Sequence, residues 1–251
     1  MLNEQTCGKT EERAAICPAL LTADPSAAVP AAQIGAAYAE RIGGGVVLLE
    51  AKKDGQRKGF GSGFVISKEG HLLTCAHVVD GADEIRARLY RPGLPGGEAR
   101  WYDCAILQPV RKDPDLAMLR IKDGGGFTPL NLRGPGEPVE AAEEVLIVGY
   151  PFGDAPDLNM PKSICLFEGL VCGVQSAGTT RERAYIDCAG KAGCSGGPVV
   201  SRRDSRVVGV FDGSLLAQED GRLTEEMNRF IPLRLFWENF VEEFEGGDPI
   251  G

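Results

Sequence analysis

The chain contains the stretch Gly193-Cys194-Ser195-Gly196-Gly197-Pro198, which runs directly into the apolar pair Val199-Val200. Glycines on both sides of Ser195 permit a tight turn and a close approach of another molecule to the backbone. A serine on such a turn can attack a carbonyl carbon, and the N–H groups of Gly193 and Ser195 can then bind the negative oxygen that forms. Taken alone, the stretch fits equally well with a glycine-rich turn that a serine caps.

A nucleophilic serine needs a general base, and the chain has only two histidines, His71 and His77. Both precede Ser195. The α/β-hydrolases share a Gly-x-Ser-x-Gly pattern but place their histidine after the serine, so the chain order excludes them. His77 follows the apolar run at 72–76, and we expect it at the end of a strand with its ring in a cleft. His71 is expected to be exposed in the turn before that strand.

The acid that orients a catalytic histidine is expected to be partly buried. Asp115 begins the apolar run at 116–121 and meets this requirement. Asp113 is the main competitor, but it precedes a proline in a charged, loop-like setting. We therefore predict Asp115 as the acid. His77 and Asp115 would then lie in the first half of the fold and Ser195 in the second.

Short runs of β-branched and large apolar residues recur from Val46 onward, separated by glycine, proline and charged residues. They form two similar sets, at about 45–132 and 138–228, and the last strand recognised in the second set is Val207–Phe211. This spacing predicts an all-β fold of two packed antiparallel barrels. An amphipathic pattern at about 232–245 predicts a C-terminal helix. Residues 1–44 are expected to form an extension of loop and a short helix at 30–41.

Composition limits the partners and the compartment. The formal net charge is −9, which argues against nucleic acid because phosphate recognition needs a basic surface. No run approaches the roughly 18 apolar residues of a spanning helix, so no membrane partner is expected. The N-terminus shows no secretory pattern, which predicts a cytoplasmic location with the eight cysteines reduced. No Cys-x-x-Cys pair is present, and neither a metal ion nor another cofactor is expected.

Together these segments resemble the HtrA branch of the chymotrypsin-like serine proteases. The resemblance runs from about Gly45 to Phe244 and leaves residues 1–44 uncovered. The matching segments occur in the family's order, and they are Gly61–Ser67, Leu73–Val79, Asp115–Leu119, Gly149–Gly153, Glu168–Val171, Asp187, Gly193–Pro198 and Phe230–Pro232.

The resemblance implies two six-stranded barrels and hydrolysis of peptide bonds through an acyl-enzyme on Ser195, with His77 transferring the proton. It places Ala189 at the base of the primary specificity pocket, with Gly213 and Ser214 along one wall. Because position 189 is not an acid, a preference for Lys or Arg is not supported, and a small or medium apolar side chain is expected. Asp212 is near that wall and keeps the question open. The implied partners are a peptide or protein substrate and a possible protein activator, and the oligomeric state is left open.

Two departures from the family pattern matter. Cys194 stands where HtrA proteins have asparagine and digestive proteases have aspartate, which argues against activation by a freshly cut N-terminus. A PDZ domain is not expected after the C-terminal helix. Two other functions are weighed. A two-barrel cysteine protease would need a cysteine at position 195, and Cys194 is one position early. A protease-like scaffold that binds protein partners without cutting them is the alternative from a different class.

Overall fold

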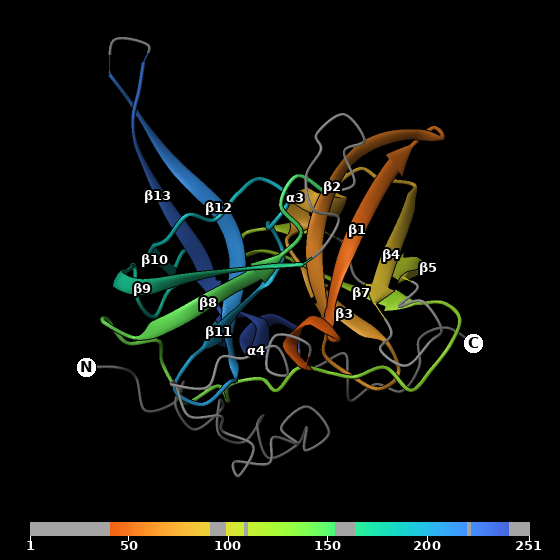
Figure 1. Cartoon of the computed structure of the whole chain (residues 1–251), viewed down its shortest axis with the longest axis horizontal. Coiled ribbons are helices and arrows are strands. Elements are labelled where there is room, and N and C mark those ends of the chain that lie inside the picture. Colours follow the sequence, from red (N-terminus) through yellow and green to blue (C-terminus); the bar gives the residue numbers. More distant parts are fainter. Residues whose placement is uncertain (1–40, 91–98, 108–109, 154–163, 220–221, 241–251) are drawn as a thin grey trace.

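The structure is a computed structural model that describes residues 41–90, 99–107, 110–153, 164–219 and 222–240. Its strands form two closed antiparallel barrels of six strands each, which lie side by side in Figure 1. The predicted all-β fold is therefore confirmed. The helix predicted at 30–41 and the extension predicted at 1–44 lie almost entirely outside the described residues.

Barrel one comes from the first half of the chain. Its strands are β1 (Val46–Lys53), β2 (Gln56–Val65), β3 (His71–Thr74), β4 (Glu84–Tyr90), β5 (Ala99–Ile106) and β7 (Asp115–Ile121). They pair in the order β3-β2-β1-β4-β5-β7, and β3 pairs with β7 to close the barrel. The two-residue strand β6 (Arg111–Lys112) pairs with β7, and the one-turn helix α3 (Ala76–Val79) follows β3.

Barrel two comes from the second half. Its strands are β8 (Glu144–Gly149), β9 (Cys165–Gln175), β10 (Arg183–Asp187), β11 (Pro198–Ser201), β12 (Val207–Glu219) and β13 (Arg222–Pro232). They pair in the order β10-β13-β12-β11-β8-β9, and β9 pairs with β10 to close the barrel. The hairpin of β12 and β13 extends well beyond the body of the barrel (Figure 1).

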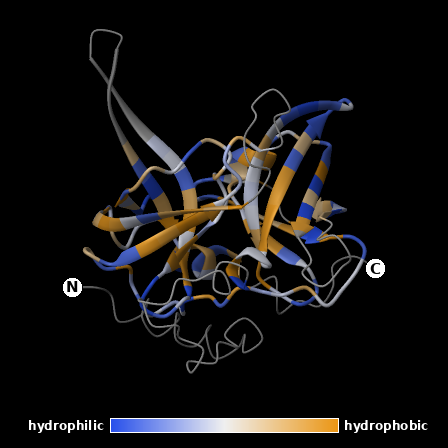
Figure 2. Cartoon of the chain, in the orientation of Figure 1, coloured by the Kyte–Doolittle hydropathy of each residue, from blue (hydrophilic) through white to orange (hydrophobic). Residues whose placement is uncertain are grey.

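Alternate residues of the central strands pack into two different apolar layers. In β1, Val47 and Leu49 pack inside barrel one, whereas Val46 and Leu48 join a layer shared by both barrels. Successive side chains point to opposite faces of a strand, so a continuous apolar run is what a strand buried on both faces requires. Strand β8 alternates in the same way. Figure 2 shows the hydrophobic strands facing one another between the barrels, with hydrophilic residues at the β1–β2 turn.

The helix α4 (Arg234–Phe240) covers part of the shared layer. Its residues Phe236 and Trp237 are fully buried, and the indole N–H of Trp237 donates a 2.8 Å hydrogen bond to the carbonyl oxygen of Arg133. Because this carbonyl lies in the segment between the barrels, α4 ties that segment to barrel two. The predicted C-terminal helix is therefore present, and it begins at Arg234 because the chain before it still belongs to β13.

The sequence patterns missed β13 and most of β12. The predicted strand ends at Phe211, whereas β12 continues to Glu219 and pairs with β13 along its length. The sequence Thr224-Glu225-Glu226 within β13 is polar, so a search for apolar runs passes over it. Backbone pairing with β12 and β10 defines this strand instead. Among the described residues, no helix is long and apolar enough to cross a membrane.

Candidate active site

His77 lies on α3, the helical turn after β3, and the prediction that it ends a strand is wrong. Cys75 has an extended backbone and begins the turn. Ala76 and Val79 are three residues apart and both buried, so they anchor one side of the turn in barrel one. In the sequence, this short apolar stretch is indistinguishable from the end of a strand. The side chain of His77 is 48% exposed.

Asp115, the first residue of β7, holds His77 through two hydrogen bonds. Its Oδ1 accepts the backbone N–H of His77 at 2.9 Å, and its Oδ2 lies 2.5 Å from the imidazole Nδ1. The hydrogen bond to Asp115 raises the pKa of His77 above its usual value, although burial acts the other way. Burial pushes the pKa of Asp115 upward, but its hydrogen bonds with His77 outweigh this and the pKa lies below its usual value. An ionised Asp115 therefore keeps the proton on Nδ1 and leaves Nε2 as the basic nitrogen.

The two competing residues are engaged elsewhere. Asp113 is exposed, and its carboxylate lies 3.6 Å from the guanidinium of Arg181. His71 is the first residue of β3, half-buried, with its Nδ1 2.7 Å from the hydroxyl of Ser67. It is therefore part of a strand, and the prediction that it is exposed in a turn is wrong. Its pairing with Arg120 places it near the opposite end of β7 from Asp115.

Ser195 lies on the loop between β10 and β11, and both barrels hold this loop. The carbonyl oxygen of Ser195 accepts the N–H of Ser62, on β2 of barrel one, at 2.8 Å. The N–H of Gly196 donates to the carbonyl oxygen of Phe211, on β12 of barrel two, also at 2.8 Å. The position of the serine is thus fixed by one hydrogen bond to each barrel.

The backbone before Ser195 presents two donors. Gly193 has a φ of +93°, and a Cβ atom there would lie 2.5 Å from the carbonyl oxygen of Tyr150, so only glycine fits without displacing the loop. Within the described parts of the chain, the N–H groups of Gly193 and Ser195 have no hydrogen-bond partner. Two such donors on one loop can bind an anionic oxygen.

Two consecutive residues of β12 show that Ser195 lies close to His77 and Asp115, because one is near Ser195 and the other is near the histidine and the aspartate. A Cβ atom on Gly213 would lie 3.8 Å from the hydroxyl oxygen of Ser195. The carboxylate of the preceding residue, Asp212, lies within 4.8 Å of a ring nitrogen of His77 and of a carboxylate oxygen of Asp115. The structure thus brings the three predicted residues to one place. No hydrogen bond joins His77 to Ser195 in the described structure, and such bonds often tighten only when substrate binds.

Ser62 is a site residue that the sequence reasoning did not single out. Its side chain is fully buried, and its hydroxyl donates a 2.8 Å hydrogen bond to the carbonyl oxygen of Gly193. The hydroxyl oxygen of Ser62 also accepts the backbone N–H of Tyr150 at 2.9 Å. The sequence signal that could have identified Ser62 is a serine between two glycines, directly before an apolar stretch.

Asp212 is buried and does not lie open to a substrate side chain. Its Oδ2 is 2.9 Å from the Nε of Arg183 and 2.9 Å from the Nε of Arg229. With Cys75, His77 and Asp115 it forms a set of atoms close enough together to approach a metal ion. However, both oxygens of Asp115 are hydrogen-bonded to His77, and two guanidinium groups hold Asp212. This arrangement is a network of paired charges and not an open set of ligands.

The residues expected at the specificity pocket are only partly brought together. Gly213 lies beside Ser195, and Ser214 donates a 2.8 Å hydrogen bond to the side-chain oxygen of Asn228. Asn228 is buried and donates in turn to the carbonyl oxygen of Cys188 at 2.6 Å. Ala189 is exposed. Asn228, which the sequence reasoning did not single out, is therefore the side chain that bridges the two segments flanking Ser195.

Cys194 lies on the same loop as Ser195, and its side chain is buried in the interior of barrel two. Burial raises the pKa of its thiol to about 11. A thiol with this pKa is almost entirely protonated at neutral pH and is a poor nucleophile. The geometry therefore agrees with the prediction that this side chain points away from the cleft.

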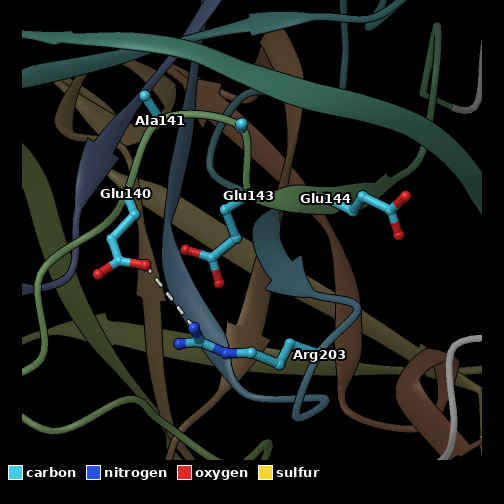
Figure 3. Close-up of a pocket in the computed structure, with 6 residues that line it drawn as sticks. Glu140, Ala141, Glu143, Glu144 and Arg203 are labelled. Atoms are coloured by element: carbon cyan, nitrogen blue, oxygen red, sulfur yellow. Dashed lines mark ion pairs between the residues drawn. The ribbon is translucent and has the colours of Figure 1, made fainter.

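A separate pocket of about 380 Å³ lies at the start of β8 and is shown in Figure 3. It is lined by residues 140–144 and by Arg203, whose guanidinium pairs with Glu140 at 3.8 Å. Strand β8 begins at Glu144 in this pocket and ends at Gly149, where it contacts Cys194. The length of β8, roughly 17 Å, thus separates this pocket from the loop that carries Ser195.

Comparison with known proteins agrees with this arrangement. The family model described as a trypsin-like peptidase domain matches residues 61–210. A DegP-like periplasmic serine endoprotease of Marinomonas sp. is 34% identical over 162 residues, which cover 63% of this chain and 30% of that protein. The serine protease HhoA of Synechocystis sp. is 30% identical over 155 residues, covering 61% of this chain and 36% of that protein. The chain thus spans about a third of the length of these relatives.

Two solved structures share the fold. The serine endoprotease from Yersinia pestis has a TM-score of 0.63 and 19% identity, and the match covers 83% of this chain and 65% of that one. An HtrA-type protease solved with a tripeptide has a TM-score of 0.65 and 22% identity, covering 87% of this chain and 64% of that one. At this level of identity, both support the chymotrypsin-like architecture alone.

The predicted cytoplasmic location is contradicted, because relatives from Marinomonas, Halomonas and Pseudomonas are named as periplasmic enzymes. The cysteines do not identify the compartment. The six described cysteines are free, and Cys75, Cys104 and Cys194 are buried. A buried thiol shielded from oxidants stays reduced in either compartment. Because the family model matches more than half of its residues, this chain belongs to the trypsin-like peptidase family.

Proposed function

We propose that this domain is a serine endopeptidase that cleaves peptide bonds through an acyl-enzyme on Ser195. His77 acts as the general base and Asp115 orients it. The backbone N–H groups of Gly193 and Ser195 bind the oxyanion. Peptides or proteins are the substrates, and the names of the relatives favour the periplasm as the compartment.

One observation carries this proposal: Asp115 binds both the backbone N–H and the imidazole Nδ1 of His77, beside the loop of Ser195. Two hydrogen bonds to one carboxylate fix the ring and its tautomer. The raised pKa of His77 has the same origin, and it favours proton uptake at the moment of attack.

The reaction follows from these positions. Nε2 of His77 takes the hydroxyl proton as Oγ of Ser195 forms a bond to the carbonyl carbon, and the carbonyl oxygen becomes negative. The two backbone donors bind that oxygen. The C–N bond then breaks as His77 returns the proton to the leaving amine. Water, deprotonated by the same nitrogen, releases the acyl group and restores the hydroxyl of Ser195.

We also propose that a protein partner or a peptide activates the enzyme. The N–H of Phe152 donates a 2.7 Å hydrogen bond to the carbonyl oxygen of Ala192, next to Gly193. A molecule that moved the segment around Phe152 would therefore move the N–H donors of the loop that carries Ser195.

We also propose residues 45–251 as the peptidase domain and residues 1–44 as an N-terminal extension.

The experiment is labelling of the purified protein with a fluorophosphonate probe, in wild type and in the Ser195→Ala and Cys194→Ala variants. We expect labelling of wild type and of Cys194→Ala, and none of Ser195→Ala. Cleavage of casein by the same three proteins should follow the labelling. Folded wild type that fails to react, both alone and with added peptides, would contradict the proposal and favour a binding scaffold.

A further inference from the structure

Asp212 is paired with two arginines from two other strands of barrel two. It lies on β12 with its side chain only 5% exposed. Arg183, the first residue of β10, donates a 2.9 Å hydrogen bond from Nε to its Oδ2. Arg229, on β13, places its Nε at 2.9 Å from the same oxygen. In the barrel order β10-β13-β12, Arg229 comes from the strand next to β12 and Arg183 from the strand beyond it, so both arginines approach the carboxylate from the same side of β12.

The carboxylate of Asp212 lies close to His77 and Asp115, on the other side of the boundary between the barrels. An oxygen of Asp212 lies within 4.8 Å of a ring nitrogen of His77 and of a carboxylate oxygen of Asp115, two residues that belong to barrel one. Two carboxylates this close, each mostly buried, repel each other unless positive charges balance them. Arg183 and Arg229 supply two positive charges for the two carboxylates, so the group is neutral while His77 is neutral.

We propose that Asp212 is a positioning residue of this site, which balances the charge around Asp115 and stabilises the positively charged form of His77. It rests on the proposed function in that His77 must be the base. The charge balance itself exists whether or not Ser195 reacts.

The charged groups that face His77 act in the directions this requires. Besides Asp115, the negative charge of Asp212 raises the pKa of His77, and Arg229 lowers it. Cys75 is the remaining titratable group in the cluster, and burial raises the pKa of its thiol well above the usual value, so it stays uncharged. Asp212 and Arg229, both in barrel two, therefore shift the pKa of His77 in opposite directions.

The two histidines of the chain make a direct test possible. NMR spectra of the imidazole Cε1–H groups should show two titrating signals, which His71→Gln assigns. The titrations are carried out in the full chain carrying Ser195→Ala, with Asp212→Asn, Arg229→Gln or both added. We expect Asp212→Asn to lower the pKa of His77 by about half a unit or more, and Arg229→Gln to raise it. The double variant should return toward the parent value.

Asp123→Asn serves as the matched control, because it removes one negative charge from an exposed position, and it should leave His77 unchanged. Equal His77 pKa values in all variants would overturn the proposal, as would shifts of the same sign in both single variants. If Asp212→Asn fails to fold, Arg229→Gln still decides, since Asp212 keeps its hydrogen bond to Arg183.

Activity gives a second measurement. With Ser195 restored, Asp212→Asn should lower kcat about tenfold or more with KM little changed, because the charged form of His77 occurs only after attack begins. An unchanged kcat would contradict the positioning role. Wild type without any activity, combined with the expected NMR shifts, would reject the peptidase assignment and leave the charge balance intact.

Discussion

The hydroxyl of Ser62 donates a hydrogen bond to the carbonyl oxygen of Gly193 at 2.8 Å, although the two residues are 131 positions apart. Ser62 belongs to barrel one, and Gly193 lies on the loop of barrel two that carries Ser195. The backbone N–H of Ser62 also donates to the carbonyl oxygen of Ser195. One residue of the first barrel thus fixes the backbone on both sides of Cys194, and so the direction of the two proposed oxyanion donors.

Ser62→Ala should reduce kcat/KM by about ten- to a hundredfold while the protein stays folded. The Gly193 carbonyl and the Tyr150 N–H lose their shared partner, and a misplaced oxyanion donor costs about this much or more. Steady-state kinetics on a peptide ester would measure the loss. Ser67→Ala removes a hydroxyl that contacts His71 and serves as the control. Equal losses in both variants would rule out a special role for Ser62.

Asp115→Asn should lower kcat by about a thousand- to ten-thousandfold with little change in the fold. The amide can no longer hold His77 in the tautomer that leaves Nε2 basic. Single-turnover kinetics would report the acylation step directly. Asp113→Asn alters an exposed carboxylate close by in the sequence and should cost less than twofold. A large loss in Asp113→Asn and a small one in Asp115→Asn would reverse the assignment.

The pH dependence of the reaction should reflect the raised pKa of His77. The base must be neutral to accept the serine proton, so kcat/KM should fall as the pH drops through the folded-state pKa of His77. This pKa lies above the usual value of about 6.5, because the hydrogen bond to Asp115 favours the charged ring. The half-maximal point should therefore lie above pH 6.5 in a rate profile measured in constant ionic strength. A half-maximal point clearly below that value would contradict the geometry.

The raised pKa of His77 also affects the stability of the fold. This contribution is largest at low pH, whereas activity is expected to be highest at high pH. Because the folded state binds the His77 proton more tightly, this group stabilises the fold at pH values below its unfolded pKa. The contribution is lost as the pH rises through the folded pKa. Urea unfolding of Ser195→Ala and of Ser195→Ala/His77→Gln at pH 5.5 and 8.5 would isolate this term. The difference between the two proteins should be larger at pH 5.5, and a larger difference at pH 8.5 would refute it.

Glu143→Ala should destabilise the fold by about 3–5 kcal/mol. Glu143 pairs with Arg133, and the two side chains are only 5% and 1% exposed. The mutation therefore leaves a buried positive charge whose remaining partner is Asp204, at 3.4 Å. Its neighbour Glu144 has a side chain that is 57% exposed and pairs with Arg202 at 3.4 Å. Glu144→Ala should therefore cost at most about 1 kcal/mol. Urea unfolding in the Ser195→Ala background would measure both, and similar losses would contradict the buried pair.

Much of the fold could be predicted from the sequence because it depends on local patterns of apolar and polar residues. The run Val46-Val47-Leu48-Leu49 indicated a strand, and the structure confirms it and shows that it is buried on both faces. The helical turn of His77 was misread because four residues are too few to separate a period of two from one of 3.6. Strand β13 was missed because pairing with its neighbours, and not its own composition, defines it.

The sequence by itself determined the all-β architecture, the chain order that excludes α/β-hydrolases, and the proposed set of His77, Asp115 and Ser195. Residue chemistry and local polarity are enough for these inferences. Only the tertiary structure decided that Ser62 donates a hydrogen bond to the Gly193 carbonyl. It also decided that Asp212, which is paired with two arginines, lies close to Asp115. These contacts join residues far apart in the chain. They depend on strand register and on how two barrels pack, and no local stretch of sequence encodes either one.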